Sequence, residues 1–239
     1  MRGSISAVRS YLLAFFLAAV AFVAVASAET GRTAMETKRI FVATLNADSV
    51  TVYPAGHFGN VPNLVTDPKL ASPNAIARDA AGNIYVANYY GDSVTEYAKG
   101  ASGNPNPIAT VFGSETGLKS PSGIALDAEG NIYVTNAKGG GASGHGSVTV
   151  YPPHSDGDVK PIESISGAAT GLDEPSGIAL DSSGDIYVVN QAGFTGSGSV
   201  TVYNSGSNGN VAPARKLSGQ KTHISTPAGL LWTRRATCT

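Results

Sequence analysis

The chain has 239 residues, and its 16 Lys and Arg side chains against 17 Asp and Glu give a formal net charge of −1 at pH 7. The sequence has no basic patch, so nucleic acid and anionic membrane surfaces are poor partners for it. Cys238 is the one cysteine in the sequence, so a disulfide framework is excluded even in an oxidising compartment.

The first 28 residues have the pattern of a secretory signal peptide. Arg2 and Arg9 supply the basic start, residues 11–25 form the apolar run, and Ala-Ser-Ala at 26–28 is a small-residue cleavage site. A retained membrane anchor is the alternative, although the run is shorter than the roughly 20 apolar residues that a bilayer span needs. Cleavage near Ala28 would leave 14 basic against 17 acidic residues. We expect an exported protein, periplasmic or secreted, without stable membrane insertion.

A phrase of about fifty residues then recurs, after a lead-in at 29–37 that we expect to be flexible. Its clearest copy reads PSGIALD (121–127), EGNIYVTN (129–136), GSVTVYP (146–152) and KPIESIS (160–166). The leading prolines at 73, 121, 175 and 227 are 48, 54 and 52 residues apart. A fixed period of this length is typical of stacked or radial repeats. The copies span about 38–72, 73–120, 121–174 and 175–226, and a further strand starts at 227–231.

Each copy has the residue pattern of four short β-strands. β-Branched and aromatic residues cluster in runs such as Ile132-Tyr133-Val134, and Gly, Asn, Asp, Ser and Pro separate the runs. Residues 127–131 and 181–185 link two runs as tight hairpin turns. In the SVTVY run, the two valines should face one side of the sheet and the threonine the other. Four short strands in each unit predict the blades of a β-propeller.

The expected architecture is therefore all-β, a β-propeller with about four blades. Four-stranded sheets should begin near Pro73, Pro121 and Pro175, and a three-stranded first sheet should run over 39–70 because that copy lacks the opening strand. Four blades are few for a closed ring, so we expect an open or strained arc in which 227–231 does not pair with 40–44. The side chains expected between blades are Ile124, Leu126, Ile132, Val134, Val148, Val150, Ile178, Leu180, Ile186 and Val188.

The units resemble NHL-type repeats of the six-bladed, TolB-like propeller superfamily. The matching residues are P-x-G-I-A-L-D at 121–127, G-N-I-Y-V-x-N at 130–136 and S-V-T-V-Y at 147–151, and the resemblance covers 38–231. It implies a propeller, here an open or truncated six-bladed ring. Such folds host sensors, scaffolds and several enzymes, so the resemblance does not name a function.

Three asparagines end the second strand of successive copies and are candidate ligand-binding residues: Asn88, Asn136 and Asn190. Propeller topology puts these strand ends on the face where each blade starts, at the mouth of the central channel. A ring of amides there could bind a polar ligand or a cation. The alternative is that each Asn caps its own turn, and recurrence in every complete copy favours this structural role.

The loops after these asparagines differ more between copies than the strands do. The loop at 89–92 is short, whereas 137–146 and 191–198 are long and Gly-rich. Binding residues are often carried by loops on a rigid scaffold. The side chains there that could hold a ligand are Tyr89, Tyr90, His145 and Phe194, and the alternative is unconstrained variation in exposed loops.

The resemblance to this superfamily also implies two possible enzyme classes. Gluconolactonase-like enzymes set carboxylates and amides around a divalent metal, several of them near the start of innermost strands. Asn74, Ser122, Ser176 and Ala228 hold that position here, without the carboxylate that a hard cation prefers. The four histidines have no metal-ligand spacing, and none matches the catalytic histidine that a streptogramin-lyase-like role needs. We therefore expect no catalytic residue, no metal and no cofactor.

The preferred hypothesis is an exported, non-enzymatic propeller that binds a protein, peptide or glycan through its loops. A degenerate gluconolactonase-like or lyase-like enzyme is the alternative. A third hypothesis is a truncated product without autonomous function, because residues 232–239 abandon the repeat pattern. Loss of one base from codons for PAGLAVDAAGNLYVTN can give PAGLLWTRRATCT and a stop, so this tail is interpreted as a frameshift scar, which sequencing beyond the stop codon tests.

Overall fold

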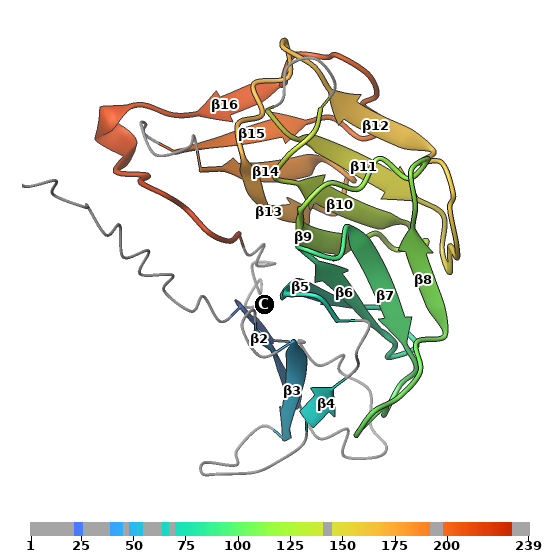
Figure 1. Ribbon diagram of the computed structural model, residues 1–239. Coiled ribbons are helices and arrows are strands. Elements are labelled where there is room, and N and C mark those ends of the chain that lie inside the picture. Colours follow the sequence, from blue (N-terminus) through green and yellow to red (C-terminus); the bar gives the residue numbers. More distant parts are fainter. Residues whose placement is uncertain are drawn as a thin grey trace, which may run out of the picture.

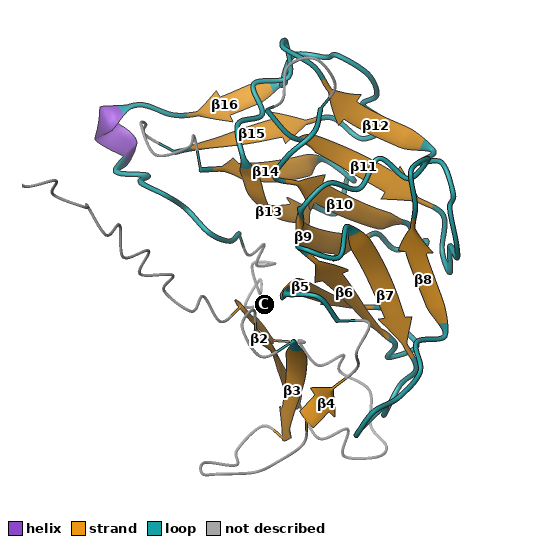
Figure 2. Cartoon of the chain, in the orientation of Figure 1, coloured by secondary structure: helices purple, strands orange, loops and turns teal. Residues whose placement is uncertain are grey.

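Four sheets fan out around a common centre as an open arc (Figure 1). The computed structural model describes residues 22–25, 39–44, 48–54, 64–66, 70–140, 145–191 and 198–230. Helix is limited, in these residues, to the three-residue 3-10 turn η2 (Gln220–Thr222), which follows the last sheet (Figure 2). Within the same ranges no helix is long and apolar enough to cross a membrane. The prediction of an all-β propeller with about four blades is confirmed.

Each blade is one sheet of four antiparallel strands in sequence order. Blade 1 contains β1 (Phe22–Val25), β2 (Arg39–Thr44), β3 (Ser49–Pro54) and β4 (Leu64–Thr66). Blade 2 contains β5 (Pro73–Arg78), β6 (Ile84–Asn88), β7 (Ser93–Tyr97) and β8 (Ala109–Phe112). Blade 3 contains β9 (Pro121–Leu126), β10 (Ile132–Asn136), β11 (Ser147–Tyr151) and β12 (Glu163–Ser166). Blade 4 contains β13 (Pro175–Leu180), β14 (Ile186–Asn190), β15 (Ser199–Tyr203) and β16 (Arg215–Leu217). The predicted starts at Pro73, Pro121 and Pro175 are confirmed.

The prediction of a three-stranded first sheet is wrong. Blade 1 has a fourth strand, β1, which comes from the apolar run of the predicted signal peptide and pairs with β2 from Phe22↔Ala43 to Val25↔Ile40. The sequence FVAV has strong β-propensity, and it covers an edge of β2 that would otherwise be bare. Because β1 and β3 occupy both edges of β2, residues 227–230 do not close the ring there. Leu231 and the tail at 232–239 lie outside the described residues.

The hydrophobic core lies in the seams between blades. We call the side of a blade that faces the preceding blade its front face, and the opposite side its rear face. In β10, Ile132 and Val134 point to blade 2, whereas Tyr133 points to blade 4, as strand alternation requires. The three seams repeat one composition, rear face against front face: Phe41, Val50 and Val52 against Ile84, Val86 and Tyr97; Tyr85, Val94 and Val111 against Ile132, Val134 and Tyr151; Tyr133, Val148 and Ile165 against Ile186, Val188 and Tyr203.

The predicted core residues are buried with two exceptions. Leu126 and Leu180 are half-buried, because each ends the first strand of its blade beside an exposed hairpin turn, although each still packs against a core cluster. The predicted alternation in SVTVY is confirmed in blade 3, where Val148 and Val150 share the cluster on the rear face and Tyr151 belongs to the cluster on the front face.

In blades 3 and 4, a turn forms hydrogen bonds with the fourth strand of the preceding blade. We call this fourth, outermost strand the rim strand. We call residues 156–158 and 208–210 the rim hooks of blades 3 and 4. In blade 3, the Asp156 carboxylate accepts a hydrogen bond from Thr110 N at 2.8 Å, and Gly157 forms a parallel bridge with Val111. In blade 4, Asn208 and Gly209 repeat this contact on β12. The hooks add directional hydrogen bonds to seams that are otherwise apolar.

The first strands of successive blades are also tied together near the centre. Asn74 Nδ2 donates to Ser122 O at 2.9 Å, Ser122 Oγ donates to Pro175 O at 2.5 Å, and Ser176 Oγ donates to Pro227 O at 2.8 Å. The residues before the four leading prolines all have positive φ: Ser72, Ser120, Glu174 and Thr226. Residues 227–230 therefore stand where the opening strand of a next blade would stand.

Replacement of Ile132 by Ala should lower the free energy of unfolding by about 2–5 kcal/mol, because it removes buried methylenes from a close-packed seam. Ile132 is 1% exposed. Urea denaturation of the purified protein measures the loss. Ile108 is 54% exposed and provides the matched control, since Ile108→Ala should change stability by no more than about 0.5 kcal/mol. Equal effects of the two substitutions would contradict the seam as the core.

Stability should fall when the pH rises above about 10. Burial, with the negative charges of Asp127 and Glu163, raises the pKa of Tyr133 from 10.0 to about 12. A pKa raised on folding contributes stability in full below the unfolded value, and this contribution is lost as the pH rises from 10 to 12. Urea midpoints across this range measure the effect, and Tyr133→Phe should make the curve flatter. A steeper curve for the variant would contradict this origin.

Candidate functional site

The loops that follow the second strands and the starts of the blades share one face of the arc, which we call the loop face. Backbone hydrogen bonds join them in three blades: Tyr89 N to Ser72 O, Ala137 N to Ser120 O, and Gln191 N to Glu174 O. The hairpin turns and the rim hooks lie on the opposite face. There Asp79, Asp127 and Asp181 accept backbone hydrogen bonds within their own turns.

The three candidate asparagines, Asn88, Asn136 and Asn190, lie on this face with no exposed surface. Each donates its Nδ2 to a threonine hydroxyl of the third strand at 3.1–3.2 Å. In Asn136 and Asn190, Oδ1 accepts from the backbone N of the residue seventeen positions earlier, at 3.0 and 3.1 Å. These contacts support the structural role that recurrence favoured, because the amides join each second strand to its neighbours rather than face the channel.

The short loop of blade 2 carries an aromatic pair on this face, in which Tyr89 is half-buried and Tyr90 is exposed. Tyr90 is 69% exposed, and its ring stands edge-on to that of Tyr89, with 5.2 Å between ring centroids and 83° between planes. Next to the pair, Lys119 Nζ lies 2.7 Å from Asp92 Oδ2, and Asp92 Oδ1 accepts from Ser120 N at 2.6 Å. Asp92 thus fixes the lysine against the loop that carries the tyrosines, and this region has apolar, cationic and hydroxyl groups.

The long loop of blade 3 places His145 near the start of blade 4. Its Nδ1 lies 3.6 Å from Asp173 Oδ1, and both side chains are largely exposed. His145 O also accepts from Glu174 N at 3.2 Å, which holds the loop against the next blade. Phe194 lies outside the described residues, so its proposed role stays a prediction.

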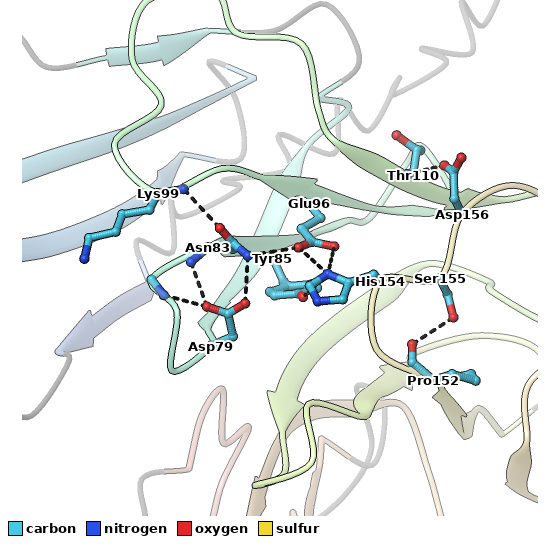
Figure 3. A network of polar contacts seen from close by, with 11 residues as sticks. Asp79, Asn83, Tyr85, Glu96, Lys99, Thr110, Pro152, His154, Ser155 and Asp156 are labelled. Atoms are coloured by element: carbon cyan, nitrogen blue, oxygen red, sulfur yellow. Dashed lines mark hydrogen bonds and ion pairs between the residues drawn. The ribbon is translucent and has the colours of Figure 1, made fainter.

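A second cluster, which the sequence analysis did not single out, lies in the seam of blades 2 and 3 on the hairpin face (Figure 3). Glu96 of β7 is 3% exposed, and both of its oxygens lie close to His154 Nδ1, at 2.9 and 3.1 Å. An ionised carboxylate only accepts hydrogen bonds, so with Glu96 ionised Nδ1 of His154 is the donor. Asn83 Nδ2 donates to Glu96 at 3.3 Å, and Tyr85 OH lies 3.5 Å from His154 Nδ1.

Both members of this pair depart from the repeat. In the SVTVY run, Glu96 stands where the other blades have Val52, Val150 and Val202. In the turn after that run, His154 stands where the other copies have glycine, at Gly56, Gly100 and Gly206. His154 has φ of 54°, a conformation that glycine adopts without strain. Comparison of the copies with one another identifies both residues as exceptions to the repeat. The structure then shows that these two exceptions, in neighbouring blades, are in contact.

The Glu96–His154 pair has the arrangement that orients an imidazole for acid–base work. The buried carboxylate fixes the tautomer and leaves Nε2 as the acceptor of the neutral ring, on a side chain that is 62% exposed. Burial, together with the charge of Glu96, raises the pKa of Tyr85 well above its ordinary value, so this hydroxyl stays protonated as a donor. No group of three or more His, Cys, Asp and Glu side chains gathers anywhere in the described ranges.

The chain matches no protein-family model and no curated protein. Solved structures share its fold: Kuenenia stuttgartiensis hydrazine synthase (TM-score 0.55, 19% identity, 75% of this chain and 46% of that one) and virginiamycin B lyase from Staphylococcus aureus (0.53, 13%, 82% and 57%). A Lactobacillus plantarum protein is similar too (0.55, 20%, 81% and 54%). The chain is a β-propeller. It spans about half the length of these structures, and such identities establish the fold alone.

The effect of His154→Gly on stability should depend on whether Glu96 is present. In the unmodified protein, His154→Gly should cost about 1–3 kcal/mol of stability, because it leaves a buried carboxylate without its partner. In a Glu96→Val background, the same change should be neutral or stabilise by up to about 1 kcal/mol, because glycine accepts positive φ. Chemical denaturation of the four proteins measures the coupling. Equal effects in both backgrounds would show that the pair does not interact.

Proposed function

We propose that this protein is an exported NHL-type propeller that acts as a non-enzymatic binding module for a protein, peptide or glycan. The observation that carries the proposal is the Tyr89–Tyr90 pair on the loop face, with Tyr90 exposed and Tyr89 half-buried, in the same loop as Asp92 of the Lys119–Asp92 ion pair. Tyrosine supplies a rigid, amphipathic contact surface with little loss of side-chain entropy, and it is enriched at binding hot spots.

The loops are supported by a rigid scaffold, which favours binding without rearrangement. Asp92 fixes Lys119 and the start of blade 3, and Tyr89 and Tyr90 donate their backbone N–H groups to Ser72 O and Ala71 O at 3.0 and 3.2 Å. Preorganised contacts lose less entropy when a ligand binds. A rigid scaffold that carries loops of different length and sequence is a common arrangement for recognition.

The polar side chains near the centre favour this proposal over a metal-dependent lactonase. Asn74, Ser122 and Ser176, at the position that gluconolactonase-like enzymes use near their metal by resemblance, each hydrogen bond to the neighbouring opening strand. Their donor groups therefore have a structural use. Two hydroxyls and an amide also lack the negative charge that a hard divalent cation prefers.

Substitution at the tyrosine pair tests the binding proposal. The protein is applied to arrays of glycans and of short peptides, and the tightest ligand is then titrated against each variant. Tyr90→Ala and Tyr89→Ala should each weaken binding at least ten-fold, about 1.4 kcal/mol. Ile108→Ala, an exposed apolar residue at the opposite end of its blade, should bind like the unmodified protein. Unchanged affinity in both tyrosine variants would exclude the loop face as the site.

A second candidate function, acid–base chemistry, is favoured by the Glu96–His154 pair. A histidine held by a buried carboxylate is suited to general-base catalysis, which contributes about 10²–10⁴-fold to a rate. A lactone-hydrolysis assay, with and without divalent cation, examines this class. If the cluster is catalytic, His154→Gln should abolish turnover while Tyr90→Ala leaves it unchanged. The absence of turnover in the unmodified protein, or its survival in His154→Gln, would reject it.

A further inference from the structure

The two ends of the arc leave two different blade faces uncovered. Among the residues that the structure describes, no sheet lies behind blade 4 and none lies in front of blade 1. The three internal seams each pair a rear face with a front face. One uncovered rear face therefore lies at one end of the arc, and one uncovered front face lies at the other end.

The rear face of blade 4 is uncovered at the rim. Leu217 is 55% exposed, whereas its counterparts Val111 and Ile165 are 1% and 0% exposed because the next blade covers them. Val200 and Tyr187 are half-buried, although their counterparts in blades 2 and 3 are buried. The rear face of blade 4 therefore has the side chains that form a seam in blades 2 and 3, but no front face packs against them among the described residues.

The position on blade 4 that corresponds to the hook contacts of blades 2 and 3 is also unoccupied among the described residues. A Cβ atom at Gly113 would collide with Asp158, and one at Gly167 with Asn210, because the hooks of blades 3 and 4 press against these glycines. Gly219 has the same position in blade 4 and a similar φ, 106° against 119° and 121°. A Cβ atom there would meet nothing within 4 Å. Blade 4 is thus shaped for a hook that the described chain does not supply.

The front face of blade 1 is uncovered in the complementary way. Val42, Thr51 and Tyr53 are half-buried. Their counterparts in the other blades have at most 2% of their surface exposed: Val86, Thr95, Tyr97, Val134, Thr149, Tyr151, Val188, Thr201 and Tyr203. The same residue types are therefore present in blade 1 as in the front faces that pack inside every internal seam.

We propose that copies of this chain associate head to tail, with the rear face of blade 4 packed on the front face of blade 1 of the next copy. The three internal seams show what such faces bind. A contact between unlike faces either closes a ring of two copies or extends into a longer series. The proposal is independent of the function assigned to the loop face.

In this arrangement, two segments compete for the position of the opening strand beside β2: β1 of the same copy and residues 227–230 of the other copy. Residues 227–230 lie beside β13 as the opening strand of a next blade: Ser176 Oγ donates to Pro227 O, and a Cβ at Gly177 would be 3.1 Å from Gly229 Cα. The equivalent Cβ at Gly123 would be 3.1 Å from Gly177 Cα in the internal seam. In blade 1, β1 holds the opening position beside β2. When two copies meet, these positions coincide.

The strand that leaves is β1, because it lies in the segment predicted to be cleaved at export. This step depends on that prediction. Residues 227–230 of one copy then pair with β2 of the next and complete its first blade. Such a strand exchange covers the edge of β2 that removal of β1 would expose, and bare edges otherwise promote aggregation.

Sedimentation velocity of the chain that begins at Glu29 tests the proposal. The unmodified chain should associate as its concentration rises, either as a two-copy particle or as a longer series. Leu217→Asp and Val42→Asp should each remain monomeric, because each lacks one of the two faces. An equimolar mixture of the two variants should form a one-to-one dimer, since the rear face of the Val42→Asp chain still fits the front face of the Leu217→Asp chain.

Ile162→Asp is the matched control, because Ile162 is 53% exposed but lies on neither end face, and it should associate like the unmodified chain. Circular dichroism verifies that each variant is folded. A monomeric unmodified chain at every concentration, or folded variants that remain monomeric when mixed, would overturn the head-to-tail contact. The chain that retains residues 1–28 should associate at least ten-fold more weakly. Equal association of the two forms would overturn the strand exchange.

Discussion

The packing of one blade's rear face on the next blade's front face is the interaction on which this molecule depends. A four-stranded sheet of this kind is apolar on both sides, so a single blade cannot bury its own core. In each seam an aromatic residue (Phe41, Tyr85 or Tyr133) and valines from one sheet meet Ile, Val and Tyr from the next. Burial of such side chains contributes about 1.5–3 kcal/mol each relative to exposure. The repeat in the sequence is the direct result of this need, because the same faces must recur.

Hydrogen bonds of polar groups then fix how neighbouring strands and blades are positioned, which non-directional apolar contacts do not specify. The rim hooks, the buried asparagines and the serine hydroxyls near the centre each recur from blade to blade. Their recurrence indicates a structural role, and departures from the repeat identify candidates for a different role. The Glu96–His154 pair is such a departure, since valine and glycine serve the fold at the same positions in the other blades.

Much of this could be predicted from the sequence, because the period and the strand alternation are local patterns repeated many times. The strand starts at Pro73, Pro121 and Pro175, the buried Ile132 and Val134, and the structural role of Asn136 all depend on such patterns. The β1 strand could not be predicted in this way, because its apolar run also fits a signal peptide and only a free edge on β2 selects the pairing. The contact of Glu96 with His154 joins residues 58 positions apart, which requires the seam geometry as well as the repeat.

The rim hooks give the chain a direction. Each hook belongs to a later blade and holds an earlier one, so blades 2 and 3 are each secured by a segment that is made after them. During synthesis, an emerging blade remains incompletely held until about fifty further residues have left the ribosome, and domains and repeats generally fold from the amino-terminal end in this order. In the finished protein, β16 is exposed along its length and no hook of the described residues holds it, so we expect protection from hydrogen exchange to increase from the rim of blade 4 toward the rims of blades 2 and 3.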